Sequence, residues 1–170
     1  MGMRKAWLLA ASAATLVAGC SGNTEDTPPD AAPATTAAAT AAPAAAPAAA
    51  APTADSTDTV DGTTLASLTP NAENGKVVFL QCKTCHVLEP GQNRIGPSLA
   101  GIVGRAAGTV EGFSYTPANA NSGITWTEEK LFQYLENPQR VVPGTKMAFA
   151  GLSKAQDRAD VIAYLKAPTE

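Results

Sequence analysis

The 170-residue chain carries a formal net charge of −3, is 45% hydrophobic and contains only 5% aromatic residues. Its length suits one domain, but alanine and proline crowd residues 21–69, whereas every Tyr and Phe lies beyond residue 78. Residues 21–69 also contain six acidic and no basic residues, while residues 70–170 contain ten basic and nine acidic ones. This near-neutral balance gives no basic stripe for nucleic acid and no polybasic patch for anionic lipid.

The first nineteen residues have the pattern of an export signal. Arg4 and Lys5 precede an uncharged apolar run, residues 6–19, which is too short for a membrane-spanning helix of about 20 residues. The run ends in LVAGC, which resembles the lipobox of bacterial lipoproteins. Residues 1–19 are therefore predicted to be a lipoprotein signal peptide, and Cys20 to be lipidated. An ordinary secretory signal or an uncleaved anchor is the alternative, and each of these routes exports the chain.

Residues 20–69 are predicted to be the lipidated cysteine and a disordered tether. Alanine favours helices, but prolines interrupt the segment and no alanine run exceeds four residues. Isolated helices shorter than about 12 residues are marginal in water, and residues 31–58 contain no large apolar side chain to bury. A flexible coil of this length would span roughly 40 Å.

Residues 70–170 are predicted to form an all-α domain with three main helices. The first helix is expected over residues 71–82. The second follows Thr125 and Glu128, which have capping-box spacing, and ends at Pro138. The third is predicted within GLSKAQDRADVIAYLKAP, where a second capping-box pattern comprises Ser153 and Gln156.

Residues 87–123 are predicted to be mostly loop, because they are rich in Gly, Pro, Asn and Ser. One short helical turn is expected after Tyr115, and no alternating pattern predicts a sheet. About 100 residues with short helices and long loops bury a limited fraction of their surface. Something besides side chains is therefore expected to fill the interior.

The segment LQCKTCHVLEP, residues 80–90, contains the candidate reactive and metal-binding side chains. Cys82 and Cys85 are two residues apart, and the chain's only histidine, His86, follows directly. A Cys-x-x-Cys pair serves disulfide exchange, half of a zinc site, or haem attachment. Disulfide exchange expects a βαβ setting, and a structural zinc site would need carboxylates to complete its roughly four ligands. Cys-x-x-Cys-His is the signature of c-type haem, in which two thioethers hold the porphyrin and the histidine lies under the iron.

A second axial ligand is expected to be Met147, in the segment VVPGTKMAF. Removal of the signal peptide leaves it as the only methionine of the mature chain. With His86 used on one side of the iron, the thioether of Met147 is the softest remaining ligand. The alternative is that Met147 is an ordinary core residue.

Six motifs, in order, resemble those of class I cytochromes c of the mitochondrial and alphaproteobacterial type. The resemblance covers about residues 70–168 and rests on GKVVFLQCKTCH, GPSLAGIVGR, GFSYTPAN, ITWTEEKLFQYLENP, VPGTKMAFAGL and DVIAYLK. It implies the class I cytochrome c fold: short helices and long loops around one haem c bound covalently through Cys82 and Cys85.

The resemblance also implies roles for individual residues. His86 would be the proximal iron ligand, oriented by the carbonyl of Pro97, and Met147 the distal ligand. The remaining roles concern the surroundings of the haem: propionate hydrogen bonds from Arg105, Tyr115 and Trp126, and a polar pair near the methionine, Tyr134 and Thr145. Gly75 and Phe79 would contact the last helix at Tyr164.

The function implied is that of a single-haem electron carrier, not an enzyme, held by lipid on the periplasmic side of a bacterial envelope. By analogy with the family, its partners would be a quinol-oxidising cytochrome bc complex and a terminal oxidase, and a monomer is expected. The alternative is a haem peroxidase, a reductase or a gas sensor with a displaceable Met147. Lys83 and Lys146 are among the few basic residues expected near the haem edge, so tethering would replace electrostatic steering.

Overall fold

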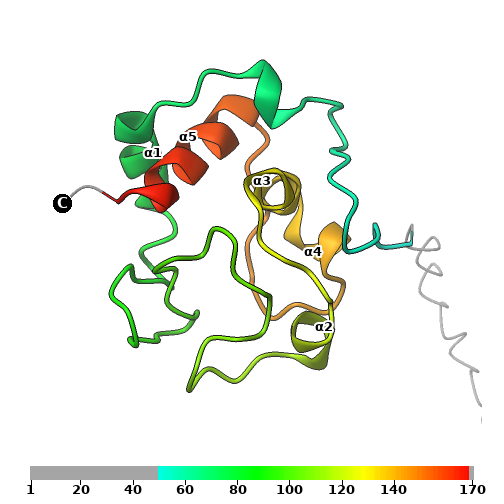
Figure 1. Ribbon diagram of the computed structural model, residues 1–170, viewed down its shortest axis with the longest axis vertical. Coiled ribbons are helices and arrows are strands. Elements are labelled where there is room, and N and C mark those ends of the chain that lie inside the picture. Colours follow the sequence, from blue (N-terminus) through cyan, green and yellow to red (C-terminus); the bar gives the residue numbers. More distant parts are fainter. Residues whose placement is uncertain (1–49, 169–170) are drawn as a thin grey trace, which may run out of the picture. The chain divides into compact units, whose positions relative to one another are not determined.

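The computed structural model describes residues 50–168 (Figure 1). The predicted signal peptide, Cys20 and tether residues 21–49 lie outside the described residues. Within residues 50–168 the regular structure is helical, with one isolated antiparallel bridge between Ala106 and Thr125 and no strand. The all-α prediction is therefore confirmed. None of the described helices is long and apolar enough to cross a membrane.

Helix α1 (Ala72–Phe79) begins at Asn71, whose side chain accepts a hydrogen bond from the backbone N–H of Asn74. Regular α-helix was expected up to residue 82, but it ends at Phe79. Tighter turns continue, in which the N–H of Cys82 donates to the carbonyl of Phe79 at 2.8 Å. Because these turns extend the helix, α1 carries the Cys-x-x-Cys-His motif at its C-terminal end.

Helix α2 (Pro117–Ala120) follows Tyr115, as predicted. Helix α3 (Glu128–Glu136) also confirms its prediction, but the predicted capping box at Thr125 is wrong. The cap is Thr127, whose hydroxyl accepts a hydrogen bond from the Lys130 N–H at 3.1 Å. Thr125 is held in the bridge to Ala106, which keeps the chain extended for two more residues.

Helix α4 (Pro138–Val141) follows α3 directly and was not predicted. Pro138 ends α3 as expected, yet it also starts α4. A proline is tolerated in the first turn of a helix, where its missing N–H has no intrahelical partner anyway. Asn137 caps this turn by accepting a hydrogen bond from the N–H of Arg140.

Helix α5 (Ala155–Lys166) confirms the third predicted helix. Its predicted capping box is wrong, because Lys154 is the N-cap and makes no side-chain cap hydrogen bond. The Gln156 amide donates instead to the carbonyl of Thr69, at 2.9 Å, and to the carboxylate of Asp160, at 2.7 Å.

Helices α1 and α5 cross at a glycine. A Cβ atom on Gly75 would lie 2.0 Å from the carbonyl oxygen of Asp160 and 2.9 Å from the Cβ of Tyr164. Beside this crossing, the rings of Phe79 and Tyr164 are 5.4 Å apart. The contact expected from the resemblance is therefore present.

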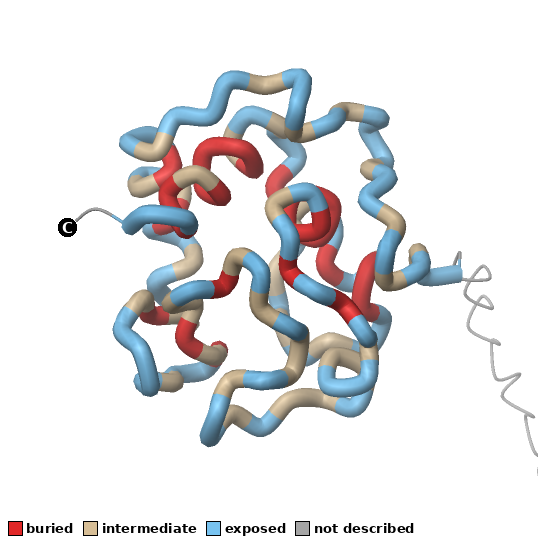
Figure 2. The backbone as a smooth tube through the Cα atoms, viewed as in Figure 1, coloured by how far each residue is buried: buried red, intermediate tan, exposed pale blue. Residues whose placement is uncertain are grey.

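The buried residues are concentrated on α3, on α5 and in the segment around α4 (Figure 2). All five residues from Lys130 to Tyr134 are buried, so α3 is covered on its polar side as well as on its apolar side. The apolar cluster includes Phe79, Trp126 and Phe132, with Cys82 and Met147 packed at its margin.

Residues 50–69 were assigned to the tether from the sequence, but in the structure they lie against the helices. Leu65 and Leu68, in and after the short 3-10 helix η1 (Leu65–Ser67), pack on the apolar cluster. Residues 53–61, here called the strap, bond to side chains of α3, α4 and α5. Composition did not reveal this docking, because helix side chains bind mainly the strap backbone.

Gly75→Ala is expected to destabilise the protein by about 3 kcal/mol, because overpacking of a close contact costs this much when backbone atoms must move. The control is Val77→Ala on the same helix, where the side chain is 63% exposed and a change of at most about 0.5 kcal/mol is expected. Denaturant unfolding of the haem-loaded protein, followed by circular dichroism, measures both. Equal stability of the two variants would contradict the tight crossing.

Candidate functional site

The turn after α1 brings the two cysteines and the histidine together. The N–H groups of Cys85 and His86 both donate to the carbonyl of Cys82, at 3.0 and 2.9 Å. Burial, with a smaller contribution from the neighbouring Cys85, raises the pKa of Cys82 to about 11. Disulfide-exchange cysteines instead have a lowered pKa, so the environment of Cys82 does not suit that chemistry.

His86 is held in the state that a metal ligand requires. Its Nδ1 lies 2.7 Å from the carbonyl oxygen of Pro97, and a carbonyl only accepts hydrogen bonds, so Nδ1 carries the proton. Burial lowers the pKa of His86, and the Pro97 carbonyl opposes this effect in part. A neutral imidazole with a protonated Nδ1 has a free lone pair on Nε2. The position predicted for Pro97 is therefore the one observed.

The imidazole also packs against Gly96. A Cβ atom at this position would lie 2.3 Å from Cε1 of His86. Gly96 was not among the predicted site residues, although it stands immediately before the proline of GPSLAGIVGR. The glycine leaves the space that the ring occupies.

Met147 is hydrogen-bonded to both residues of the predicted polar pair. The Tyr134 hydroxyl donates a hydrogen bond to Met147 Sδ at 3.7 Å, and the Met147 N–H donates to the Thr145 hydroxyl at 3.3 Å. Burial raises the pKa of Tyr134, and a hydrogen bond with Thr145 opposes this effect. The Trp126 ring lies 4.7 Å from the Tyr134 ring. Trp126, Tyr134, Thr145 and Met147 therefore form one connected group.

Arg105 and Tyr115 form a second group. Arg105 donates to the carbonyls of Ala100, at 2.8 Å, and Ser98, at 3.0 Å. Burial lowers the pKa of Arg105 and raises the pKa of Tyr115. The electrostatic interaction between the two side chains opposes both of these shifts. The Arg105 guanidinium therefore also braces the loop of residues 98–100, a role that the sequence did not predict.

Two further polar residues were missed. Thr116 Oγ1 and Asn119 Oδ1 are buried without a hydrogen-bond partner in the described structure. An unsatisfied buried polar group costs about 1–3 kcal/mol, so these atoms fit a site that receives a polar group from a bound molecule. Thr116 stands directly after Tyr115, and a haem propionate can accept a hydrogen bond from its hydroxyl, whereas the Asn119 amide oxygen is an acceptor and calls for a donor. Their one sequence signal was the motif GFSYTPAN.

A zinc site finds no support in the described part of the chain. No group of three or more His, Cys, Asp or Glu side chains within residues 50–168 is arranged to hold a metal ion. Carboxylates that would complete a site with Cys82, Cys85 and His86 are therefore not gathered there. The donor set of two thiols, one imidazole and one thioether fits haem c.

Comparison with known proteins identifies the family. The cytochrome c family model matches residues 72–168. Cytochrome c 2.1 of Caenorhabditis elegans is 53% identical over 95 residues, which cover 55% of this chain and 86% of the relative. Cytochrome c2 of Blastochloris viridis is 52% identical over 97 residues, which cover 56% and 76%. The solved structure of cytochrome cH from Methylobacterium extorquens superposes with a TM-score of 0.55 at 43% identity, covering 56% of this chain and 97% of that chain.

The chain therefore belongs to the cytochrome c family, and its fold is that of class I. Members of this family carry one haem c bound through cysteines, and Cys82 and Cys85 are the cysteines present for it. The protein is a single-haem electron carrier that exchanges electrons with redox partner proteins, and it is not an enzyme.

Gly96→Ala is expected to displace the His86 ring, because the added methyl group would overlap it. The haem-loaded variant should have a changed ferric spectrum and bind carbon monoxide when reduced. Gln92→Ala, an exposed change in the same loop, serves as the control and should retain the parental spectrum. An unchanged spectrum in Gly96→Ala would show that the ring does not depend on this glycine.

Proposed function

We propose that the protein is a membrane-tethered periplasmic electron carrier whose iron is ligated by His86 and Met147. The observation that carries the iron-binding part of this proposal is the 2.7 Å hydrogen bond from His86 Nδ1 to the Pro97 carbonyl, because it leaves Nε2 for the metal. Met147 would be the second ligand, since this residue is partly buried and its sulfur accepts a hydrogen bond from Tyr134.

The bound haem supplies one-electron chemistry between Fe(II) and Fe(III). The protein sets the potential at which this occurs. Methionine opposite histidine raises the potential, and the apolar side chains around Met147 disfavour the extra positive charge of the ferric state. The Tyr134 hydrogen bond holds the Met147 sulfur in place and withdraws electron density from it.

The propionates are proposed to lie among Arg105, Tyr115 and Trp126, as the resemblance implies. Thr116 joins this set because its hydroxyl is buried and has no hydrogen-bond partner in the described structure. A hydroxyl can donate to a carboxylate directly. The propionates would thus be neutralised and sealed from water on the α2 side of the domain.

Met147→Ala tests the ligand assignment. The ferric protein should lose its far-red sulfur-to-iron absorption band, and the reduced protein should bind carbon monoxide rapidly because one iron position is open. Phe149→Leu, a change in a neighbouring residue that also packs on the core, should leave both properties unchanged. Rapid carbon monoxide binding by the unmodified protein would favour the alternative function of a sensor or a peroxidase.

The membrane attachment is proposed from the N-terminal sequence. The lipobox-like LVAGC predicts a lipid on Cys20, and more than one acyl chain is needed for stable anchoring. An anchored domain would stay near membrane partners at a high local concentration. A quinol-oxidising bc complex as donor and a terminal oxidase as acceptor are proposed by family analogy.

Deleting residues 21–49 should slow electron transfer to a membrane-bound oxidase by about tenfold, because the domain can then no longer reach its partner freely. Lys83→Gln is the comparison, and about a twofold effect is expected, since few basic residues surround the site. Stopped-flow oxidation in native membranes measures both rates. The reverse ranking would reject tethering as the substitute for electrostatic steering.

A further inference from the structure

Two polar side chains of α3 are buried on the side away from its apolar residues. Lys130 is 2% exposed and Gln133 is 0% exposed, although a helix at a domain surface normally presents such residues to water. Their side chains bond to the strap, residues 53–61. The strap therefore forms the outer wall over α3 (Figure 1).

The ammonium of Lys130 gathers oxygen atoms from the strap. It donates to the carbonyls of Thr53, at 3.1 Å, and Ser56, at 2.6 Å, and to Gln133 Oε1 at 2.8 Å. An ammonium has three donors, so each has an acceptor. Burial lowers the pKa of Lys130, and the charge of Asp55 opposes this effect. The three oxygens offset the cost of removing the charge from water.

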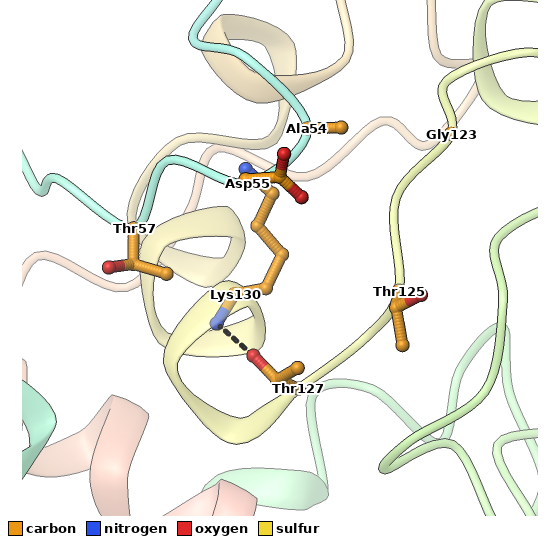
Figure 3. Close-up of a pocket in the computed structure, with 7 residues that line it drawn as sticks. All are labelled: Ala54, Asp55, Thr57, Gly123, Thr125, Thr127 and Lys130. Atoms are coloured by element: carbon orange, nitrogen blue, oxygen red, sulfur yellow. Dashed lines mark hydrogen bonds between the residues drawn. The ribbon is translucent and has the colours of Figure 1, made fainter.

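A pocket of about 140 Å³ lies beside this ammonium (Figure 3). One wall of the pocket is formed by strap residues between Ala54 and Thr57, and the other by residues of the segment Gly123 to Thr127. The side chain of Lys130, from α3, also lines it. None of the predicted haem-site residues lines it. The pocket is therefore a gap left along the seam between the strap and the helical domain.

A further backbone carbonyl of the strap, that of Asp58, also binds side chains of the domain. Its oxygen accepts hydrogen bonds from Gln133 Nε2, at 2.8 Å, and from both terminal nitrogens of Arg140, at 3.1 and 3.2 Å. Gln133 thus accepts from Lys130 and donates to the strap, which links the two anchor points.

The end of the strap is held by a carboxylate and a guanidinium. The Glu136 carboxylate accepts hydrogen bonds from the N–H groups of Val60, at 2.6 Å, and Asp61, at 3.0 Å. Arg158, which is 0% exposed, pairs with Asp61 at 2.6 Å. Burial would raise the pKa of Asp61, but the hydrogen bonds from Arg158 and Thr63 outweigh this effect and hold it at about 2.

Nearly all of these contacts reach the backbone of the strap. The domain therefore supplies the specificity through the side chains of Lys130, Gln133, Glu136 and Arg140, and the strap sequence itself is weakly constrained. The strap also precedes residues 72–168, which the family model matches.

We propose that the α3–α4–α5 face is a built-in docking site for the strap, and that Lys130 positions this segment so that the N-terminal part of the chain leaves the domain at a fixed point near residue 52. The effect on reach rests on the proposed tethering. If Cys20 is anchored and the residues before the strap form the coil predicted from the sequence, that coil is roughly 30 residues long and its reach roughly 30 Å, instead of roughly 40 Å.

Hydrogen exchange of the full-length, haem-loaded protein tests the docking without any substitution. The N–H groups of Val60 and Asp61 should exchange at least tenfold more slowly than in an unstructured chain. Exchange at the unstructured rate would overturn the proposal. Because this measurement needs no lipid, its outcome is independent of whether Cys20 is acylated.

Lys130→Met tests the anchor, with Lys154→Met, at an exposed lysine, as the matched control. Lys130→Met should speed exchange at Val60 and Asp61, and cleavage by an Asp-specific protease at Asp58, by about tenfold. The far-red ferric band should persist, because the Lys130 ammonium bonds to Thr53, Ser56 and Gln133 and not to Tyr134 or Met147. Equal protection in both variants would overturn the role of Lys130.

The departure point can be measured directly. A spin label introduced by Thr53→Cys, at an exposed strap residue, should give one narrow distance distribution to the ferric iron, and the distribution should broaden when Lys130→Met is added. A distribution that is already broad without Lys130→Met would contradict a fixed exit. Retention of the haem spectrum shows in each case that the domain itself is folded.

Discussion

The hydrogen bond between His86 Nδ1 and the Pro97 carbonyl joins the two parts of the chain on which the site depends. It connects the turn after α1 to the loop that follows, and two backbone bonds reinforce it, from Gly96 to the carbonyl of Cys85 and from Leu99 to that of Val87, both at 2.8 Å. Gly96 supplies the space for the ring. One contact thereby fixes the ring orientation, its protonation and the shape of the loop.

The opposite wall of the site is built by α3 and the segment after α4. Tyr134 on α3 reaches the sulfur of Met147, while Thr145 binds the backbone of that methionine. The strap buries the other side of α3, at Lys130 and Gln133. This helix is therefore fixed from both sides, which holds the Tyr134 hydroxyl in place beside the flexible side chain of Met147.

The sequence predicted those features that depend on local pattern or on family motifs. The three main helices, the turn after Tyr115 and the Cys-x-x-Cys-His motif belong to this group. Both capping boxes were wrong, because Thr125 is drawn into a bridge and Gln156 binds Asp160. Helix α4 was missed because a proline such as Pro138 can either end one helix or stand in the first turn of the next. The strap escaped prediction because its partners are side chains more than seventy residues away in sequence, bound to its backbone.

X-ray absorption at the iron edge of the purified, haem-loaded protein tests the central claim most directly. The account predicts one sulfur and five nitrogen neighbours around the iron in both oxidation states, with the sulfur supplied by Met147 and the fifth nitrogen by His86. A spectrum that requires only nitrogen and oxygen neighbours, or five neighbours in place of six, would contradict it.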